Sequence, residues 1–365
     1  MSISQITVSI RRVLGKGLID DLAAIGIDLY TKATGRSPSI GQSRGIFGGR
    51  SLVDDPIEVL SFMVPGEVED QVVSYIISKA QLEYPGRGSV HVEDVEILHD
   101  GNIQCVNKVQ TDGLSVVGTT LRELTGICCI VQRGQGDAIA RVALDLGAGV
   151  PSLTFGTGLG VRDKMGLLRI TIPAEKELVW LTTADSDTDI VLNGMIDVGK
   201  LDQPGKGFIY TYPVKQGYLN KQVTQRDMHA AASIEQIISA IDKLTGSLDW
   251  RRHLALDEVH EDRAFLTGLV DFTLICDEGS GDELVAVAMA AGAAGASLAK
   301  VRQFRPDDGT GRVSHARENC YMVVGEVFVP TIFGALDKFG AFTDKYHGQV
   351  ITRKTDKGFT YLPPK

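Results

Sequence analysis

Two short turns combine accessible backbone amides with a basic side chain. One reads Pro-Gly-Arg-Gly and the other Pro-Gly-Lys-Gly, and their central residues are Gly86, Arg87 and Gly88, and Gly205, Lys206 and Gly207. Glycine lets the backbone approach a ligand closely, and successive N–H groups beside one cation suit an anion. The two turns are therefore candidate binding sites for a small anion. The alternative interpretation is a tight turn whose cation is solvated.

A less similar copy of this turn motif lies near the C-terminus, in "VITRKTDKGFTYLPP" at residues 350–364. Thr355 and Asp356 stand there in place of Pro-Gly, and Lys357 and Gly358 follow. Because Asp356 adds a negative charge where an anion would sit, we expect this third turn to bind an anion weakly or not at all.

Serine and lysine offer a different chemistry, nucleophilic hydrolysis. Ser152 and Ser297 lie 145 residues apart in matching sequence, with Lys164 and Lys300 nearby in the chain. A serine nucleophile needs a base within hydrogen-bond reach. The alternative is that both serines are small residues at a turn between a helix and a strand. We assign no catalytic residue, and a three-repeat Ser/Lys amidohydrolase-type enzyme stays as the alternative function.

Histidines and cysteines form no metal motif in the sequence. None of the seven histidines stands at H-x₃-H or HExxH spacing, and the five cysteines match no zinc pattern. We therefore predict no metal site. Cys128, Cys129 and Cys276 lie in apolar, strand-like runs, where we expect them to be small buried hydrophobic residues.

The elements that would carry these residues recur along the chain. Residues 128–153 and 273–298 match without a gap at eight positions 145 apart, which in the first segment are Gly134, Gly136, Asp137, Ala143, Gly147, Ala148, Ser152 and Leu153. The pattern predicts a strand, a glycine turn, a helix capped by Asp137 and ended by Gly147, and a second strand. A weaker copy begins near residue 5.

Each copy continues with a strand, a helix and a closing strand. In the middle copy these are a strand over 167–173 and a helix over 175–199; the first copy has 56–66 and 67–82, and the third has 320–330 and 331–348. The predicted fold class is α+β, with three tandem ferredoxin-like (βαββαβ) units at 5–97, 126–215 and 269–364. Connectors lie at 98–125 and 216–268, and the second carries a helix capped by Ser233 and ended by Gly246.

This order of elements, with a Gly-x-Gly turn before the final strand, resembles the PII (GlnB-like) nitrogen-regulatory family, repeated three times in one chain. The resemblance implies a pseudo-threefold, PII-trimer-like assembly and signal transduction without catalysis. It also implies that the glycine turns hold nucleotide phosphates at the clefts between units, so an adenine nucleotide is the possible cofactor. The family places its cation after the second glycine, whereas Arg87 and Lys206 lie between the two glycines.

The resemblance also implies that the long loop inside each unit binds a protein partner, a transporter or a metabolic enzyme. These loops are rich in glycine and arginine, and we expect them to be mobile and basic. The family's modifiable tyrosine is missing from all three. The expected partner-binding residues are Arg36, Arg44, Arg50, Arg162, Arg302, Arg305 and Arg312.

Composition limits the remaining possibilities. The net charge of −9 argues against nucleic acid as the main partner, and no apolar run is long enough to insert into a membrane. The N-terminus lacks a secretion signal, so we expect a cytoplasmic protein. Fusion of three units would make contacts between chains unnecessary, and we expect a monomer or a dimer formed through the helix around Ile234 to Leu244.

Overall fold

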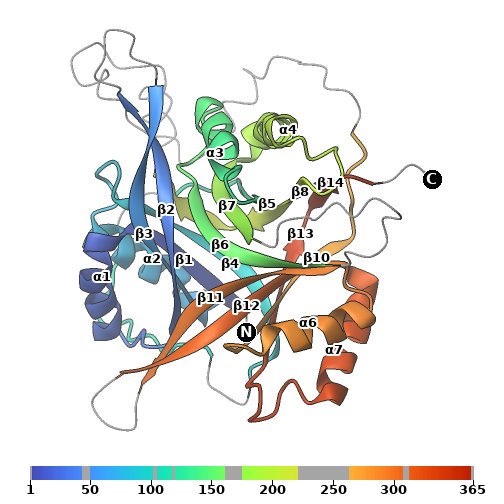
Figure 1. Cartoon of the computed structure of the whole chain (residues 1–365). Helices are drawn as coiled ribbons and strands as arrows, with labels where there is room; N and C mark the ends of the chain where they lie inside the picture. Colours follow the sequence, from blue (N-terminus) through green and yellow to red (C-terminus); the bar gives the residue numbers. More distant parts are fainter. Residues whose placement is uncertain are drawn as a thin grey trace.

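The computed structural model describes residues 2–42, 50–101, 105–116, 120–160, 175–220, 263–306 and 312–362 (Figure 1). Its strands are β1 (Ile3–Arg11), β2 (Tyr30–Gln42), β3 (Arg50–Pro65), β4 (Gly88–His99), β5 (Leu124–Gln132), β6 (Ser152–Gly160), β7 (Glu175–Ala184), β8 (Gly207–Val214), β9 (Gln216–Tyr218), β10 (Leu269–Asp277), β11 (Gly295–Pro306), β12 (Arg312–Gly325), β13 (Gln349–Thr355) and β14 (Lys357–Thr360).

The helices of the described residues named here come in three pairs, one pair beside each group of strands (Figure 1). Short 3-10 turns, at Gly66–Val68, Asp185–Asp187 and Glu326–Phe328, lead into the second helix of each pair. None of the helices in the described ranges is both long and apolar enough to cross a membrane. The pairs are α1 (Arg12–Ala24) with α2 (Glu69–Ala80), α3 (Gly136–Asp145) with α4 (Thr188–Gly199), and α6 (Gly281–Ala290) with α7 (Val329–Phe339).

All the named strands belong to one antiparallel sheet that closes on itself. The order along it is β11-β12-β10-β13-β4-β1-β3-β2-β6-β7-β5-β8-β14, and β11 also pairs with both β2 and β6. Nine of the strands, from β11 round to β6, therefore form a closed barrel. Within these nine strands closure leaves no free edge, and β7, β5, β8 and β14 continue the sheet beyond β6.

Alternation along each strand divides the residues between two environments. On β1 the apolar residues Ile6, Val8 and Ile10 are fully buried against α1 and α2 in one core cluster. The residues that alternate with them, Gln5, Thr7 and Ser9, face the inside of the barrel. Because successive side chains on a strand point to opposite faces, one strand supplies both the helix-packed core and the polar inner wall.

The predicted fold class is wrong. Three tandem ferredoxin-like units would each keep a sheet of its own, whereas the strands of all three segments form one sheet wound into a closed barrel. Pairing crosses between distant segments, since β13 pairs with β4 and β14 pairs with β8. The ferredoxin-like internal repeat and the PII-trimer-like assembly fail with it, because non-local strand pairing, which decides the architecture, leaves no local sequence signal. The resemblance to the PII family itself stays a prediction. The proposed unit boundaries stay a prediction.

Several local predictions also need correction. The helix predicted over 175–199 is in fact strand β7 followed by α4, because its first ten residues pair with β5 and β6. The long loops predicted to be mobile are largely strands, since β2 pairs with β3 and β11 pairs with β12 over most of their lengths. The connector helix around 233–246 lies outside the described residues.

The third turn motif, at residues 355–358, lies at a different place relative to its strand than the other two. The strand equivalent in position to β4 and β8 is β13, which pairs with β10. Asp356 lies after that strand, and Lys357 begins β14, which pairs with β8. The turns at Gly86–Gly88 and Gly205–Gly207 lead into β4 and β8, whereas the Asp356–Gly358 segment follows β13.

Candidate functional site

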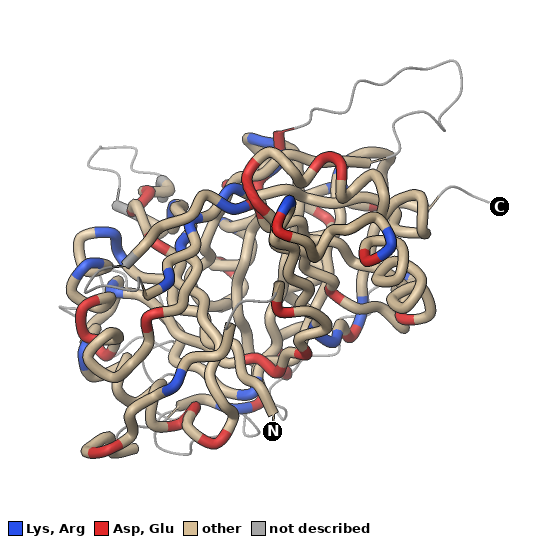
Figure 2. Tube along the Cα trace, turned by 90° about the horizontal axis from the view of Figure 1, so that it is seen from below, with Lys and Arg blue, Asp and Glu red and all other residues tan. Residues whose placement is uncertain are grey.

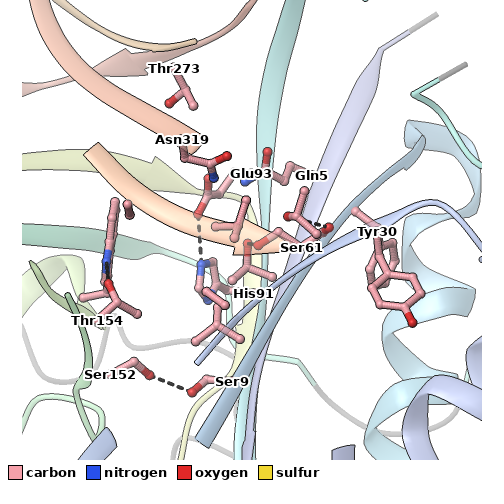
Figure 3. Close-up of a pocket in the computed structure, with 18 of the residues that line it drawn as sticks. Gln5, Ser9, Tyr30, Ser61, His91, Glu93, Ser152, Thr154, Thr273 and Asn319 are labelled. Atoms are coloured by element: carbon pink, nitrogen blue, oxygen red, sulfur yellow. Dashed lines mark hydrogen bonds and ion pairs between the residues drawn. The ribbon is translucent and has the colours of Figure 1, made fainter. Parts of the chain in front are cut away.

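The inside of the barrel contains a cavity of about 180 Å³. Its wall is formed by strands from all three segments of the chain, and Figure 3 shows side chains from several of them directed into one space. Hydroxyl and ring groups share this wall with aliphatic side chains. The hydroxyl and ring groups include Thr7, Ser9, Tyr30, Ser61, His91, Ser152, Thr154, Trp180, Tyr212, Thr273 and Tyr321.

A buried ionic cluster closes one part of the wall. Arg353 on β13 forms ion pairs with Glu93 on β4 and with Asp271 on β10. Tyr210 donates a hydrogen bond of 2.9 Å to Asp271, and the guanidinium carbon of Arg353 lies 3.6 Å from the centre of the Tyr212 ring. The side chains of Glu93 and Asp271 are only 1% and 2% exposed, so water screens these pairs very little.

The pKa values in this cluster follow from burial and pairing. Burial would raise the pKa of Glu93, but Arg353 and His91 outweigh it and lower that pKa to about 2. Burial opposes the charge of Arg353, but Glu93 and Asp271 raise its pKa well above the usual value. Burial raises the pKa values of Tyr210 and Tyr212 far above normal, so both phenols stay neutral. The cluster is therefore ionised as one cation and two carboxylates.

His91 extends the cluster toward the middle of the cavity. Its Nε2 atom lies 2.9 Å from Oε1 of Glu93, and its side chain is 15% exposed. With a neutral imidazole, Glu93, Asp271 and Arg353 together carry one uncompensated negative charge. Such a charge is costly in a buried place, so a proton on His91 or a positive group from a ligand would stabilise it.

Hydroxyl pairs lie on the cavity wall away from the charges. The Oγ atoms of Ser9 and Ser152 are 2.6 Å apart, and the indole N–H of Trp180 donates to Thr154 at 3.2 Å (Figure 3). Asn319 donates from Nδ2 to the hydroxyl of Tyr321, while its Oδ1 atom is buried with no partner in the described part of the chain. A buried acceptor without a donor costs free energy unless a water or a ligand supplies one.

The glycine turns predicted to bind an anion have structural roles of their own. Gly88 has φ +153°, and a Cβ there would lie 2.2 Å from the carbonyl oxygen of Ser9. The Nε of Arg87 donates to the carbonyl of Ala80, and the N–H of Gly86 donates to Oδ1 of Asn220. Gly207 is equally confined, with 2.3 Å to the carbonyl of Ile130. These contacts account for the turns, and anion binding there stays a prediction.

Of the arginines predicted to contact a partner, the three with described side chains have different surroundings, and their role in binding a partner stays a prediction. Arg36 forms ion pairs with Asp54, Asp137 and Glu177, so Asp137 is engaged with Arg36 and does not cap α3 as predicted. Arg302 donates to Ser314, and Arg305 is half-buried. Figure 2 shows acidic and basic residues interspersed along the chain. Arg44 and Arg162 lie outside the described residues, as do the side chains of Arg50 and Arg312.

The predicted serine–lysine pairs are not formed in the described residues. Ser152 lies on the cavity wall but bonds to Ser9, and Lys300 forms an exposed ion pair with Glu278 at 2.7 Å. Ser297 is buried, and Lys164 lies outside the described residues. Over the described ranges, no group of three His, Cys, Asp or Glu side chains could hold a metal ion. Cys128, Cys129 and Cys276 are fully buried, as predicted.

The residues that form the ionic cluster were missed. His91 and Glu93 are two apart on a strand, so the alternation of "SVHVEDVE" places them on one face. That signal could have marked β4 as polar toward the inside. Their partner Arg353 is 260 residues further along the chain, and no spacing in the sequence connects the two.

Comparisons with known proteins add little. No family model and no curated protein matches the chain. A solved structure of GilR, an oxidoreductase that catalyses the terminal step of gilvocarcin biosynthesis, with pregilvocarcin is 10% identical, with a TM-score of 0.17 over 85% of this chain and 56% of that one. The ferredoxin protease FusC E83A mutant with Arabidopsis ferredoxin is 8% identical, with a TM-score of 0.11 over 93% and 62%. This chain thus spans less than two thirds of either protein. Such scores carry no argument about function.

Proposed function

We propose that this protein binds a small polar molecule inside its barrel. The observation that supports the proposal best is the cavity inside the barrel beside the buried cluster of Glu93, Asp271 and Arg353, which carries one more negative than positive charge when His91 is neutral. Protein interiors are normally filled by apolar side chains, so a hydroxyl-lined space next to buried charges is a costly arrangement that a ligand would make favourable.

The cavity limits the size of the ligand. Its volume of about 180 Å³ is similar to that of a cavity of about 150 Å³ that binds benzene. It therefore suits a metabolite of a few heavy atoms. Neither the described residues nor the comparisons support a nucleotide site.

The charges of the wall determine which ligand chemistry fits. Arg353 is already neutralised by two carboxylates, so it has no capacity left for an anion in the cavity. Beside this cluster, the excess negative charge and the unpartnered Oδ1 of Asn319 both favour hydrogen-bond donors, whereas Arg305 lines another part of the cavity wall. We therefore expect a small amine, guanidine or amide here, in contrast to the anionic ligand predicted for the glycine turns.

A binding screen tests the proposal. Thermal shifts with small amines, guanidines and amides, each compared with a carboxylate of similar size, should show stabilisation by the donor-rich compounds only. Ser61→Leu would fill the cavity from β3 and should weaken binding at least tenfold, whereas Ser314→Leu on the exposed part of β12 should not. Equal binding by both variants would place the ligand elsewhere.

A second candidate function is hydrolysis of the bound molecule. His91 is held by a carboxylate, and the hydroxyls of Ser9 and Ser152 lie on the same cavity wall. A base held by a carboxylate and a nearby hydroxyl are the parts that acyl transfer requires. Turnover of an identified ligand that is lost in both His91→Gln and Ser9→Ala, with binding retained, would favour this enzyme.

The regulatory role expected from the sequence is the non-catalytic form of the same proposal. A sensor would bind the molecule without turnover and pass the signal to a protein partner. The sensor and the hydrolase are separated by one measurement, the recovery of unchanged ligand after prolonged incubation with the protein. Complete recovery favours the sensor.

A further inference from the structure

A second recess, of about 580 Å³, lies at the outer ends of β11 and β12. Residues from three separate parts of the chain line it: the turn after α1, the segment before β5, and the β11–β12 pair. Asn107 fixes its wall, because Oδ1 accepts the N–H groups of Asp28 and Leu29 at 3.0 and 2.9 Å. The polar lining residues are Asp28, Asn107, Lys108, Arg305 and His315.

Arg305 is the residue of the recess best suited to bind an anion. Its side chain is half-buried, and within the described ranges it forms no ion pair and no hydrogen bond with a carboxylate. Asp277 on β10 interacts electrostatically with Arg305, but its carboxylate is already paired with Arg317 and His347. A partly buried guanidinium without a carboxylate partner is a strong donor for an oxyanion, since its planar fork matches two oxygens at once.

Neighbouring groups add to the positive charge. Burial, and then Arg305 and Arg317, lower the pKa of His315. Burial and the charge of Arg317 likewise lower the pKa of Arg305. Lys108 is exposed, and Arg317 is buried but close enough to act on both Arg305 and His315. Among the described residues, Arg305, Lys108 and Arg317 together outnumber Asp28 and Asp277, so their charges sum to a positive value.

We propose that this recess binds a phosphate-sized oxyanion, with Arg305 as the main donor, His315 as a second donor and Lys108 as a cation at the rim. The site differs from both glycine turns and from the cluster of Glu93, Asp271 and Arg353. It shares Arg305 and Leu29 with the wall of the barrel cavity, and the test below separates the two sites.

Titration with inorganic phosphate tests this site. Calorimetry and thermal shifts should show saturable binding beyond that of sodium chloride at equal ionic strength, and acetate in a parallel titration distinguishes a tetrahedral oxyanion from a carboxylate. Arg305→Gln should weaken phosphate binding at least tenfold, and His315→Gln severalfold. Arg305→Lys keeps the charge without the fork, so it should give an intermediate loss.

Arg302→Gln is the matched control, because Arg302 lies on the same strand but is exposed and donates to Ser314. Its phosphate affinity should stay within twofold of the parent. Ser61→Leu should also leave phosphate binding unchanged, which separates this site from the barrel cavity. The proposal is overturned if phosphate acts no more strongly than chloride, or if Arg302→Gln and Arg305→Gln lose affinity equally. If Arg305→Gln does not fold, the Arg305→Lys comparison decides.

Discussion

Replacing Arg353 by methionine should destabilise the protein by about 3–5 kcal/mol at pH 7, the range for removing one partner of a buried ion pair. The change leaves Glu93 and Asp271 as two carboxylates that are 1% and 2% exposed and face no cation. The depressed pKa of Glu93 agrees in direction. Its ordinary value is 4.5 and its value in the fold is about 2, a net difference of about 3 kcal/mol at about 1.4 kcal/mol for each pKa unit, which Arg353 and His91 produce together against the effect of burial.

The pH dependence follows from the direction of that pKa change. Because the pKa of Glu93 is depressed in the folded protein, its contribution to stability is complete above about pH 4.5 and is lost as the pH falls toward 2. In Arg353→Met, burial without the arginine favours the protonated carboxyls, so acid should relieve the destabilisation. We therefore expect the difference in unfolding free energy between the two proteins to narrow between pH 7 and 4.5, as the buried carboxyls of the variant take up protons, and to narrow further below pH 4.5, where the parent loses the contribution of Glu93.

Urea unfolding of both proteins at several pH values between 7 and 3 measures the effect. Lys354→Met is the control, because Lys354 is the exposed neighbour on the same strand, and it should change the unfolding free energy by less than about 0.5 kcal/mol. A loss below about 1 kcal/mol for Arg353→Met at pH 7, or a loss that does not vary with pH, would refute the account of the cluster.

Three further predictions concern particular positions. Gly126→Ala should lower the unfolding free energy by about 1–3 kcal/mol, because its Cβ would lie 2.1 Å from the ring of Tyr212. Gly17→Ala, on the exposed face of α1, should instead raise the unfolding free energy by about 0.5–1 kcal/mol. A denaturant titration in which both variants change the unfolding free energy in the same direction would contradict this prediction. Glu177→Gln should lower the unfolding free energy by about 1–3 kcal/mol, because the buried carboxylate accepts hydrogen bonds from the N–H groups of Gly134 and Gly136 at 3.0 and 2.7 Å. In the same denaturant titration, Glu175→Gln, at an exposed position, should lower it by less than about 0.5 kcal/mol. At the glycine turns, Arg87→Ala and Lys206→Ala should each weaken any anion binding by about 1–3 kcal/mol while Asp356→Ala does not, and calorimetry that finds unchanged affinity in both cation variants would leave the turns purely structural.

The sequence by itself determined most of the local elements. The alternation of "ISQITVSIR" predicts a strand with one apolar face, and the apolar residues of that strand are buried under α1 and α2. The matched glycines at Gly136 and Gly281 begin α3 and α6. These signals are readable because the periods of strand and helix are set by neighbouring residues. The prediction failed at 175–199, where pairing of β7 with β5 and β6 overrode the helical pattern.

Only the tertiary structure decided where the polar faces of the strands lie. On an open sheet Gln5, Thr7 and Ser9 would be solvated, and in the closed barrel they line a cavity. Closure depends on pairs such as β13 with β4 and β11 with β2, whose members are distant in the chain. The ion pair between Glu93 and Arg353 joins residues 260 apart. Sequence periodicity shows which face of a strand is polar, but whether that face meets water or another strand is decided by contacts that cooperate only in the complete fold.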